Sequence, residues 1–294
     1  MQQMGTKNIK KKLSCPVCKR TKAEKFWAGP GYRLVRCKKC AMVWDFFPPD
    51  NLSAQYEENY FSNENPKGGY ANYFEGMAIN KKTFFDRLKK IEKKLGRKGK
   101  LLDVGCALGD CLDIARQLKW KDAEGVELSE YAYKFAKRKG LKVKNGTLQD
   151  VKYPDNYFDA VTMQDVIEHV PDPVSDLKRI HKILKPGGKV YLVTPDIDGL
   201  WSRLLGKYWY HYKPGEHIMY FGQKSITTAL KEAGFKNIES SKTYHVMSLN
   251  YILNRMRYYA PGLFGFFLSL VKGKKLENMA FRVYAGEIEA WGEK

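Results

Sequence analysis

The sequence has no apolar run long enough to cross a membrane. Its longest apolar run near the C-terminus, Gly262–Val271, has about half of the roughly 20 residues that a spanning helix needs. The first residues, MQQMGTKNIKKKL, include basic side chains but no apolar core and no small-residue cleavage site, so a secretory signal is not expected. These absences predict a cytoplasmic protein. Peripheral contact with the inner face of the membrane stays open.

Acidic residues are scarce relative to basic ones. The 294-residue chain has 32 Asp and Glu against 52 Lys and Arg, which gives a formal net charge of +20. The surface is therefore expected to attract polyanions, phosphorylated substrates or acidic lipid headgroups. Apolar residues make up 44% of the chain, enough for one substantial core and a small appendage, which excludes a disordered chain or a repeat array.

The chain has only six cysteines, and four of them form two C-x-x-C pairs. Cys15, Cys18, Cys37 and Cys40 have the spacing of a zinc ribbon, in which two knuckles present four thiolates to one ion. Disulfides are the alternative, and a reducing cytoplasm disfavours them. Four ligands leave no open coordination position, so the zinc is expected to be structural.

The positions of proline and glycine, together with the apolar periodicity, divide the chain into three regions. Pro48-Pro49-Asp50 ends the ribbon, which makes residues 1–50 the first region. Residues 51–96 contain a connector or lid, Tyr56–Tyr73, and then a leading helix, Ile79–Leu95. In this helix apolar residues recur at three- and four-residue steps, and Gly96 ends the pattern. Residues 97–294 are the main domain, with an apolar helical insertion at 245–279.

The main domain alternates short β-rich runs with helix-length segments, which predicts an α/β fold with a doubly wound parallel sheet. The expected strands are Leu101–Val104, Ala123–Val126, Lys142–Lys144, Phe158–Met163 and Lys189–Val193, followed by a final pair at Asn237–Tyr244 and Phe281–Ala290.

A turn of small residues, from Asp103 to Asp110, follows the first of these strands and opens a helix. Such a turn brings backbone amides and a helix N-terminus close to a ligand. As a dinucleotide fingerprint it fails, because Asp110 occupies the sixth position, where glycine is required. Glu127 ends the second strand, where a carboxylate can accept hydrogen bonds from two ribose hydroxyls.

Five ordered blocks, LDVGCALGD, GVELS, FDAVTMQDVIEHVPDP, LKPGG and VTPD, resemble the class I S-adenosylmethionine (SAM) methyltransferases. The resemblance implies their Rossmann-like seven-stranded sheet, with the last strand antiparallel, and SAM as the cofactor. It also implies a cofactor site, in which Asp103, Gly105, Ala107 and Gly109 surround the methionine part, Glu127 holds the ribose, Thr147 and Leu148 border the adenine, and Gln164 lines the cofactor. Ala107 departs from the family pattern, which has glycine there.

The ribbon segments GYRLVRCKKCAMVWDFFPPD and QYEENYF resemble methyltransferases that pair a zinc ribbon with this fold in polysaccharide and glycoconjugate synthesis. This resemblance implies methyl transfer to a hydroxyl or carbon of a small anionic acceptor, a sugar-nucleotide or a lipid-linked saccharide. Sugar C-methyltransferases of this type carry a further domain, and the sequence given stops at Lys294 without one.

Two histidines are candidates for the base that removes the acceptor's proton. His217 follows the fifth strand, and Glu216 beside it resembles the Glu-His pair of the sugar C-methyltransferases, with Glu216 as the orienting residue. The alternative is a structural role within a substrate-covering loop. Asp165, Glu168 and His169 resemble a proposed metal segment of quinone-biosynthesis O-methyltransferases, although support of the cofactor loop is the favoured interpretation. His181, His211 and His245 have no spaced partner and are interpreted as surface or packing residues.

The insertion from Val246 to Val271 predicts two short amphipathic helices interrupted by Pro261-Gly262. They are interpreted as a roof of the substrate pocket, as a homodimer face, or as a contact with an anionic membrane. Two other functions stay open for the chain. One is an RNA methyltransferase, disfavoured because the Asn/Asp-Pro-Pro-Tyr motif is absent. The other is a non-catalytic SAM-binding adaptor.

Overall fold

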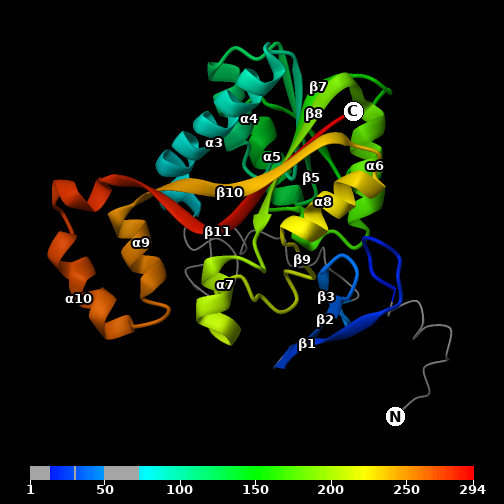
Figure 1. Ribbon diagram of the computed structural model, residues 1–294. Coiled ribbons are helices and arrows are strands. Elements are labelled where there is room, and N and C mark those ends of the chain that lie inside the picture. Colours follow the sequence, from blue (N-terminus) through cyan, green and yellow to red (C-terminus); the bar gives the residue numbers. More distant parts are fainter. Residues whose placement is uncertain (1–13, 30, 50–72) are drawn as a thin grey trace.

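The computed structural model describes residues 14–29, 31–49 and 73–294, and a seven-stranded sheet lies at its centre (Figure 1). The strands follow the order β10-β11-β8-β7-β4-β5-β6 across the sheet. Their bounds are β4 Lys100–Val104, β5 Asp122–Glu127, β6 Lys142–Asn145, β7 Phe158–Gln164, β8 Leu184–Pro195, β10 Lys236–Ser248 and β11 Ala280–Glu293. The predicted connector, Tyr56–Tyr73, lies outside the described residues except for Tyr73.

The central strands pair in parallel, and β11 is antiparallel to both of its neighbours, β8 and β10. The predicted Rossmann-like sheet with an antiparallel last strand is therefore confirmed. Strand β7 is buried along nearly its whole length, as expected for a parallel strand covered on both faces.

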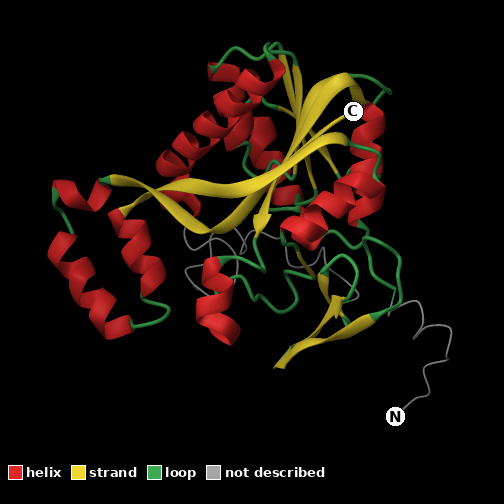
Figure 2. Ribbon diagram, viewed as in Figure 1, coloured by secondary structure: helices red, strands yellow, loops and turns green. Residues whose placement is uncertain are grey.

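Helices cover both faces of the sheet (Figure 2). On one face α3 (Tyr73–Leu95) packs against α4 (Asp110–Gln117), and Leu88 and Ile91 of α3 join a core with Leu101 and Tyr191 of the sheet. Helix α5 (Glu130–Arg138) packs against β5 and β6. On the other face α6 (Pro173–Ile183) and α8 (Gln223–Glu232) pack against each other. Helix α3 ends at Leu95 as predicted, but it begins at Tyr73, six residues before the predicted start at Ile79.

The N-terminal strands form a second sheet that includes a strand from the main domain. Strands β1 (Ala23–Gly29), β2 (Tyr32–Cys37) and β3 (Val43–Asp45) continue into β9 (Met219–Tyr220), in the order β1-β2-β3-β9. The Asp45 amide donates a hydrogen bond to the Ile218 carbonyl, 2.9 Å away. Trp44 of β3 belongs to the same buried core as the central sheet, so the ribbon packs directly on the main domain.

The remaining helices are short and lie between β7 and β9 or between β10 and β11. They are η2 (Ile167–His169), α7 (Leu200–Leu205), η3 (Gly206–Tyr208), α9 (Leu249–Met256), α10 (Pro261–Val271) and η4 (Lys275–Asn278). The insertion therefore contains the two predicted helices, α9 and α10, and Pro261 begins the second one. Among the described helices, none combines the length and the apolar character that crossing a membrane requires.

Candidate active site

The turn between β4 and α4 requires glycine at two positions. Gly105 has φ +71°, and a Cβ there would collide with the Val166 side chain. Gly109 has φ +85°, and a Cβ there would collide with Leu141. Ala107, between them, also has a left-handed φ of +46°, a conformation that costs a residue with a Cβ about 1–2 kcal/mol. The alanine thus adopts the backbone conformation that a glycine would take without strain.

Glu127, at the end of β5, holds this turn in place. One carboxylate oxygen accepts a hydrogen bond from the Ala107 amide at 2.8 Å, and the other accepts one from the Ser129 amide at 2.8 Å. A carboxylate has about four lone-pair directions, so Glu127 can accept a further hydrogen bond. Burial raises the pKa of Glu127, although the backbone amides act against it.

Asp103 lies beneath the same turn and is only 4% exposed. Burial raises its pKa to about 7, and the nearby Glu127 carboxylate adds to the effect. A ligand that brings positive charge to this place would favour the ionised form of Asp103. SAM carries such charge on its sulfonium and ammonium groups.

The residues predicted to border the adenine, and Gln164, predicted to line the cofactor, follow neighbouring strands at the same edge of the sheet. Thr147, just after β6, donates from its hydroxyl to Asp150 at 2.6 Å, and Leu148 is buried. Gln164, at the end of β7, accepts a hydrogen bond from the Arg87 guanidinium at 2.9 Å. Because β7, β4, β5 and β6 are adjacent and parallel, their carboxyl ends bring the predicted cofactor residues together.

His169, His211 and His217 form a cluster of rings, and Glu168 lies next to two of them. The rings of His169 and His217 meet edge to face, with centroids 4.8 Å apart, and the rings of His211 and His217 stack at 6.1 Å. Burial lowers the pKa values of His169 and His211 to about 4. Burial, together with His169, Lys213 and His211, lowers the pKa of His217 well below 6.5. All three imidazoles are therefore neutral at pH 7.

The Nδ1 atom of His217 is buried and unpaired within the described ranges. Its side chain is almost fully buried, and its Nδ1 atom has no hydrogen-bond partner among the residues that the structure describes. The main chain next to it is fixed, because the Ile218 amide donates to the Glu168 carbonyl at 3.0 Å. A neutral imidazole with a free ring nitrogen is suited to accept a proton.

The Glu216 carboxylate does not orient His217. In the described part of the chain it pairs with Lys213 Nζ at 3.4 Å and makes no hydrogen bond to His217. The Glu216 carbonyl oxygen instead lies 2.8 Å from His169 Nδ1. The predicted orienting contact is wrong, because the turn from Lys213 to His217 directs the carboxylate toward the lysine.

Glu168, His169 and His217 present ligand atoms within 4.8 Å of one another. The structure thus brings His217, and not Asp165, to the two residues for which a metal role was considered. Glu168 accepts a hydrogen bond from the Thr194 hydroxyl at 3.0 Å, and burial raises its pKa well above the ordinary value. These contacts agree with the favoured interpretation, support of the loop that follows Gln164.

The four N-terminal thiols converge on one point. The Sγ atoms of Cys15 and Cys40 are 3.5 Å apart, as are those of Cys18 and Cys37, and all four lie within 4.8 Å of one another. Zn–S bonds of about 2.3 Å in a tetrahedron put sulfur atoms about 3.8 Å apart. The arrangement fits one zinc ion.

A family model described as a methyltransferase domain matches residues 77–240, which is more than half of the chain. The chain belongs to this methyltransferase family. It is a SAM-dependent enzyme, and the matched region contains the turn, Glu127, Gln164 and the histidine cluster. The predicted activity class is confirmed.

Curated relatives and a solved structure agree with this assignment. The methyltransferase is 24% identical over 245 residues to the demethylmenaquinone methyltransferase of Chlorobaculum parvum, covering 76% of this chain and 96% of that one. It is 33% identical over 118 residues to the ubiquinone biosynthesis O-methyltransferase of Pseudomonas paraeruginosa, covering 37% of this chain and 50% of that one. A solved SAM-dependent methyltransferase from Thermotoga maritima shares the fold, with a TM-score of 0.52 and 20% identity, covering 76% of this chain and 94% of that one.

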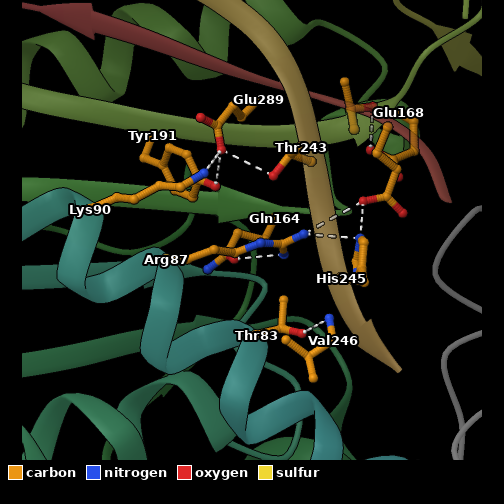
Figure 3. A network of polar contacts seen from close by, with 12 residues as sticks. Thr83, Arg87, Lys90, Gln164, Glu168, Tyr191, Thr243, His245, Val246 and Glu289 are labelled. Atoms are coloured by element: carbon orange, nitrogen blue, oxygen red, sulfur yellow. Dashed lines mark hydrogen bonds and ion pairs between the residues drawn. The ribbon is translucent and has the colours of Figure 1, made fainter. Parts of the chain in front are cut away.

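The methyltransferase also contains a buried polar network that sequence reasoning missed (Figure 3). Arg87 of α3, 3% exposed, contacts Gln164, His245 at 3.0 Å and Glu287 at 3.6 Å, while His245 pairs with Glu287. Interpreting His245 as a surface or packing residue was therefore wrong. A signal for Arg87 did exist, because it lies within the apolar stripe of its helix, four residues before Ile91.

A second part of this network joins α3 to the last strand. One oxygen of Glu289 accepts hydrogen bonds from Lys90 at 2.6 Å and from the Tyr191 and Thr243 hydroxyls at 3.0 Å each. Figure 3 shows these groups converging between α3 and the sheet. Through Arg87 the network fixes α3 against Gln164, the residue predicted to line the cofactor.

Proposed function

We propose that this methyltransferase transfers the methyl group of SAM to a hydroxyl or carbon of a small acceptor, with His217 accepting the acceptor's proton. The observation that carries the proposal is the buried, neutral His217 with an Nδ1 unpaired in the described structure, held beside the loop that follows Gln164. SAM supplies an activated methyl group, so the protein mainly has to align the acceptor and remove its proton.

We assign the cofactor-holding roles to the residues at the edge of the sheet. The Glu127 carboxylate would accept hydrogen bonds from the ribose, and Asp103 would offset the positive charge of the cofactor. Gly105, Ala107 and Gly109 let the backbone approach the methionine part. Thr147 and Leu148 border the adenine, and Gln164, fixed by Arg87, lines the methyl side.

Two acceptor classes are proposed. The basic surface and the resemblance of the ribbon favour a sugar-nucleotide or lipid-linked saccharide, because a net charge of +20 suits phosphate groups. The names of the curated relatives, which concern menaquinone and ubiquinone, favour a compound of the quinone class as the second candidate. Mass spectrometry of the products formed from SAM and each acceptor class distinguishes the two. RNA as the only substrate, or no turnover on any acceptor, would contradict both.

We assign the four N-terminal cysteines to one structural zinc ion, which their sulfur geometry fits. The ribbon sheet continues into β9, two residues after His217. Zinc binding therefore supports the segment that carries the proposed base, and no step of the methyl transfer needs the metal.

The role of His217 is tested by substituting His217→Ala and measuring turnover and SAM affinity separately. A base acts on the transition state, so turnover should fall by about 10²- to 10⁴-fold while SAM affinity stays within about twofold. His181→Ala is the matched control, because His181 lies on α6 against Phe235 and should leave both values unchanged. Near-normal turnover of His217→Ala would remove the base from the proposal.

The pH profile gives a second readout. From the ordinary histidine pKa, the sequence predicts that turnover falls below pH 6 to 7. Burial lowers the pKa of His217 well below 6.5, so the fall is expected at a lower pH, and His217→Ala should lose it. Glu216→Gln should keep most of the turnover, because the contact to His169 comes from the main chain.

A further inference from the structure

The insertion forms a helical hairpin that projects from the body of the molecule. Strands β10 and β11 remain paired beyond the main sheet, from His245 opposite Val283 to Ser248 opposite Ala280, and form a two-stranded arm. Helices α9 and α10 lie at the end of this arm, apart from the central sheet (Figure 1). Packing on the body of the protein therefore leaves much of the hairpin uncovered.

The surface of α10 is apolar and open. Its 11 residues, PGLFGFFLSLV, include no charged side chain. Leu263 is 55% exposed, Phe266 59%, Phe267 43% and Leu270 46%. These four residues are termed the apolar tip. A helix on the surface of a globular protein normally turns its apolar side chains toward the core, and an exposed cluster of this kind marks an interaction surface.

A second exposed apolar segment lies on α7. Helix α7 exposes Leu200 by 50% and Leu204 by 67%, and in Figure 1 it lies at the same end of the molecule as α9 and α10. A groove of about 540 Å³ lies between α7 and the hairpin, and its lining includes Trp201, Leu249, Ile252, Phe281, Val283 and Tyr284. The groove therefore brings together residues of α7, α9 and β11 and is largely apolar.

The charges around the apolar tip identify its partner. Residues 246–282 contain six basic side chains and one acidic one, Glu277. Lys272, Lys274 and Lys275 follow α10 directly and are exposed, and Arg257 is exposed at the end of α9. A second copy of the hairpin would add the same excess of cations to the contact, with only Glu277 to offset them. A bilayer with acidic headgroups instead neutralises them while it accepts the apolar side chains.

We propose that the apolar tip and its flanking cations dock the methyltransferase on the surface of an anionic lipid bilayer. Helix α10 is about 16 Å long at 1.5 Å per residue, about half of the hydrocarbon thickness, so it lies within the interface and does not span the membrane. The docking does not depend on which acceptor is methylated.

The test is flotation of the purified full-length protein with vesicles of phosphatidylcholine alone or with 30% phosphatidylglycerol. The wild-type protein should bind the anionic vesicles at least tenfold more tightly than the neutral ones, and 0.5 M NaCl should weaken this binding. The Phe266→Gln/Phe267→Gln variant should lose at least tenfold in affinity for the anionic vesicles. Lys272→Gln/Lys274→Gln/Lys275→Gln should remove most of the preference for them.

Phe85→Gln is the matched control, because Phe85 lies on α3 and is 42% exposed, close to the 43% of Phe267. It should bind vesicles like the wild type. SAM affinity, measured for every variant, shows that the main domain is folded, since the hairpin is separate from the cofactor turn.

Three results would overturn the proposal. One is a wild-type protein that does not float with anionic vesicles. Another is a tip variant that keeps its SAM affinity and binds these vesicles as well as the wild type. The third is a wild-type dimer in sedimentation experiments that the tip substitutions dissociate while neither protein binds lipid, which would assign the tip to a second copy of the chain.

Discussion

Asp103 allows a sharp prediction, because the fold keeps its carboxyl group protonated close to neutral pH. Its pKa is about 7 in the folded chain against an ordinary 3.8, mainly because of burial. The folded state therefore binds this proton more tightly than the unfolded state does. The resulting stabilisation is complete below pH 3.8 and is lost as the pH rises to about 7.

Asp103→Asn replaces the carboxyl group with a neutral group of the same shape. Each pKa unit corresponds to about 1.4 kcal/mol, so ionisation costs the wild-type protein about 2 kcal/mol at pH 5 and about 4 kcal/mol at pH 8. The variant avoids this cost. Its gain in free energy of unfolding over the wild type should therefore be larger at pH 8 than at pH 5, by about 2–3 kcal/mol.

The assay is urea unfolding of wild type and variant without SAM at the two pH values. Asp159→Asn is the control, because Asp159 has the opposite shift. Although burial raises its pKa, hydrogen bonds from Lys185, from the Lys100 amide and from Arg97 lower it to about 2. Asp159→Asn should destabilise the protein equally at pH 5 and pH 8, because this group titrates below both.

SAM affinity gives an independent readout for Asp103. The ionised carboxylate attracts the positive cofactor, so wild-type affinity should increase from pH 6 to pH 8 and Asp103→Asn should lose most of this increase. If the difference in stability between Asp103→Asn and wild type were the same at both pH values, Asp103 would titrate normally. The reasoning from its burial would then be refuted.

Two further predictions concern the ribose and the metal. Glu127→Ala should weaken SAM binding by about 10- to 100-fold, because two charge-assisted hydrogen bonds to the ribose are lost and the Ala107 amide loses its acceptor. Calorimetry that shows unchanged affinity would exclude Glu127 from the site. The protein purified without chelator should contain one zinc per chain, and chelation should unfold the ribbon. Because β3 pairs with β9, this unfolding should reduce turnover far more than SAM affinity. Metal analysis that finds no zinc, or full turnover after its removal, would contradict this prediction.

Local patterns in the sequence were sufficient for most of the fold and for the cofactor turn. The strands follow from short β-rich runs, α3 from its helical period, and the break at Pro261 from the missing backbone donor. Gly105 and Gly109, which the resemblance singled out, have the left-handed conformations that a tight turn between a strand and a helix requires of glycine. The four cysteines could be grouped because their spacing is itself the signal. Each of these inferences uses residues close together in the chain, where local geometry decides the outcome.

Only the tertiary structure decided which distant side chains meet. His245 lies 158 residues from Arg87 and 42 residues from Glu287, and no spacing rule joins them. The Glu216 carboxylate faces Lys213 and not His217 because of how one loop turns, and β9 completes the ribbon sheet because that loop crosses the edge of β3. The apolar side chains of α10 could be read from the sequence, but not their exposure. A helical period shows which residues share a face, whereas the long-range packing of the chain determines what, if anything, covers that face.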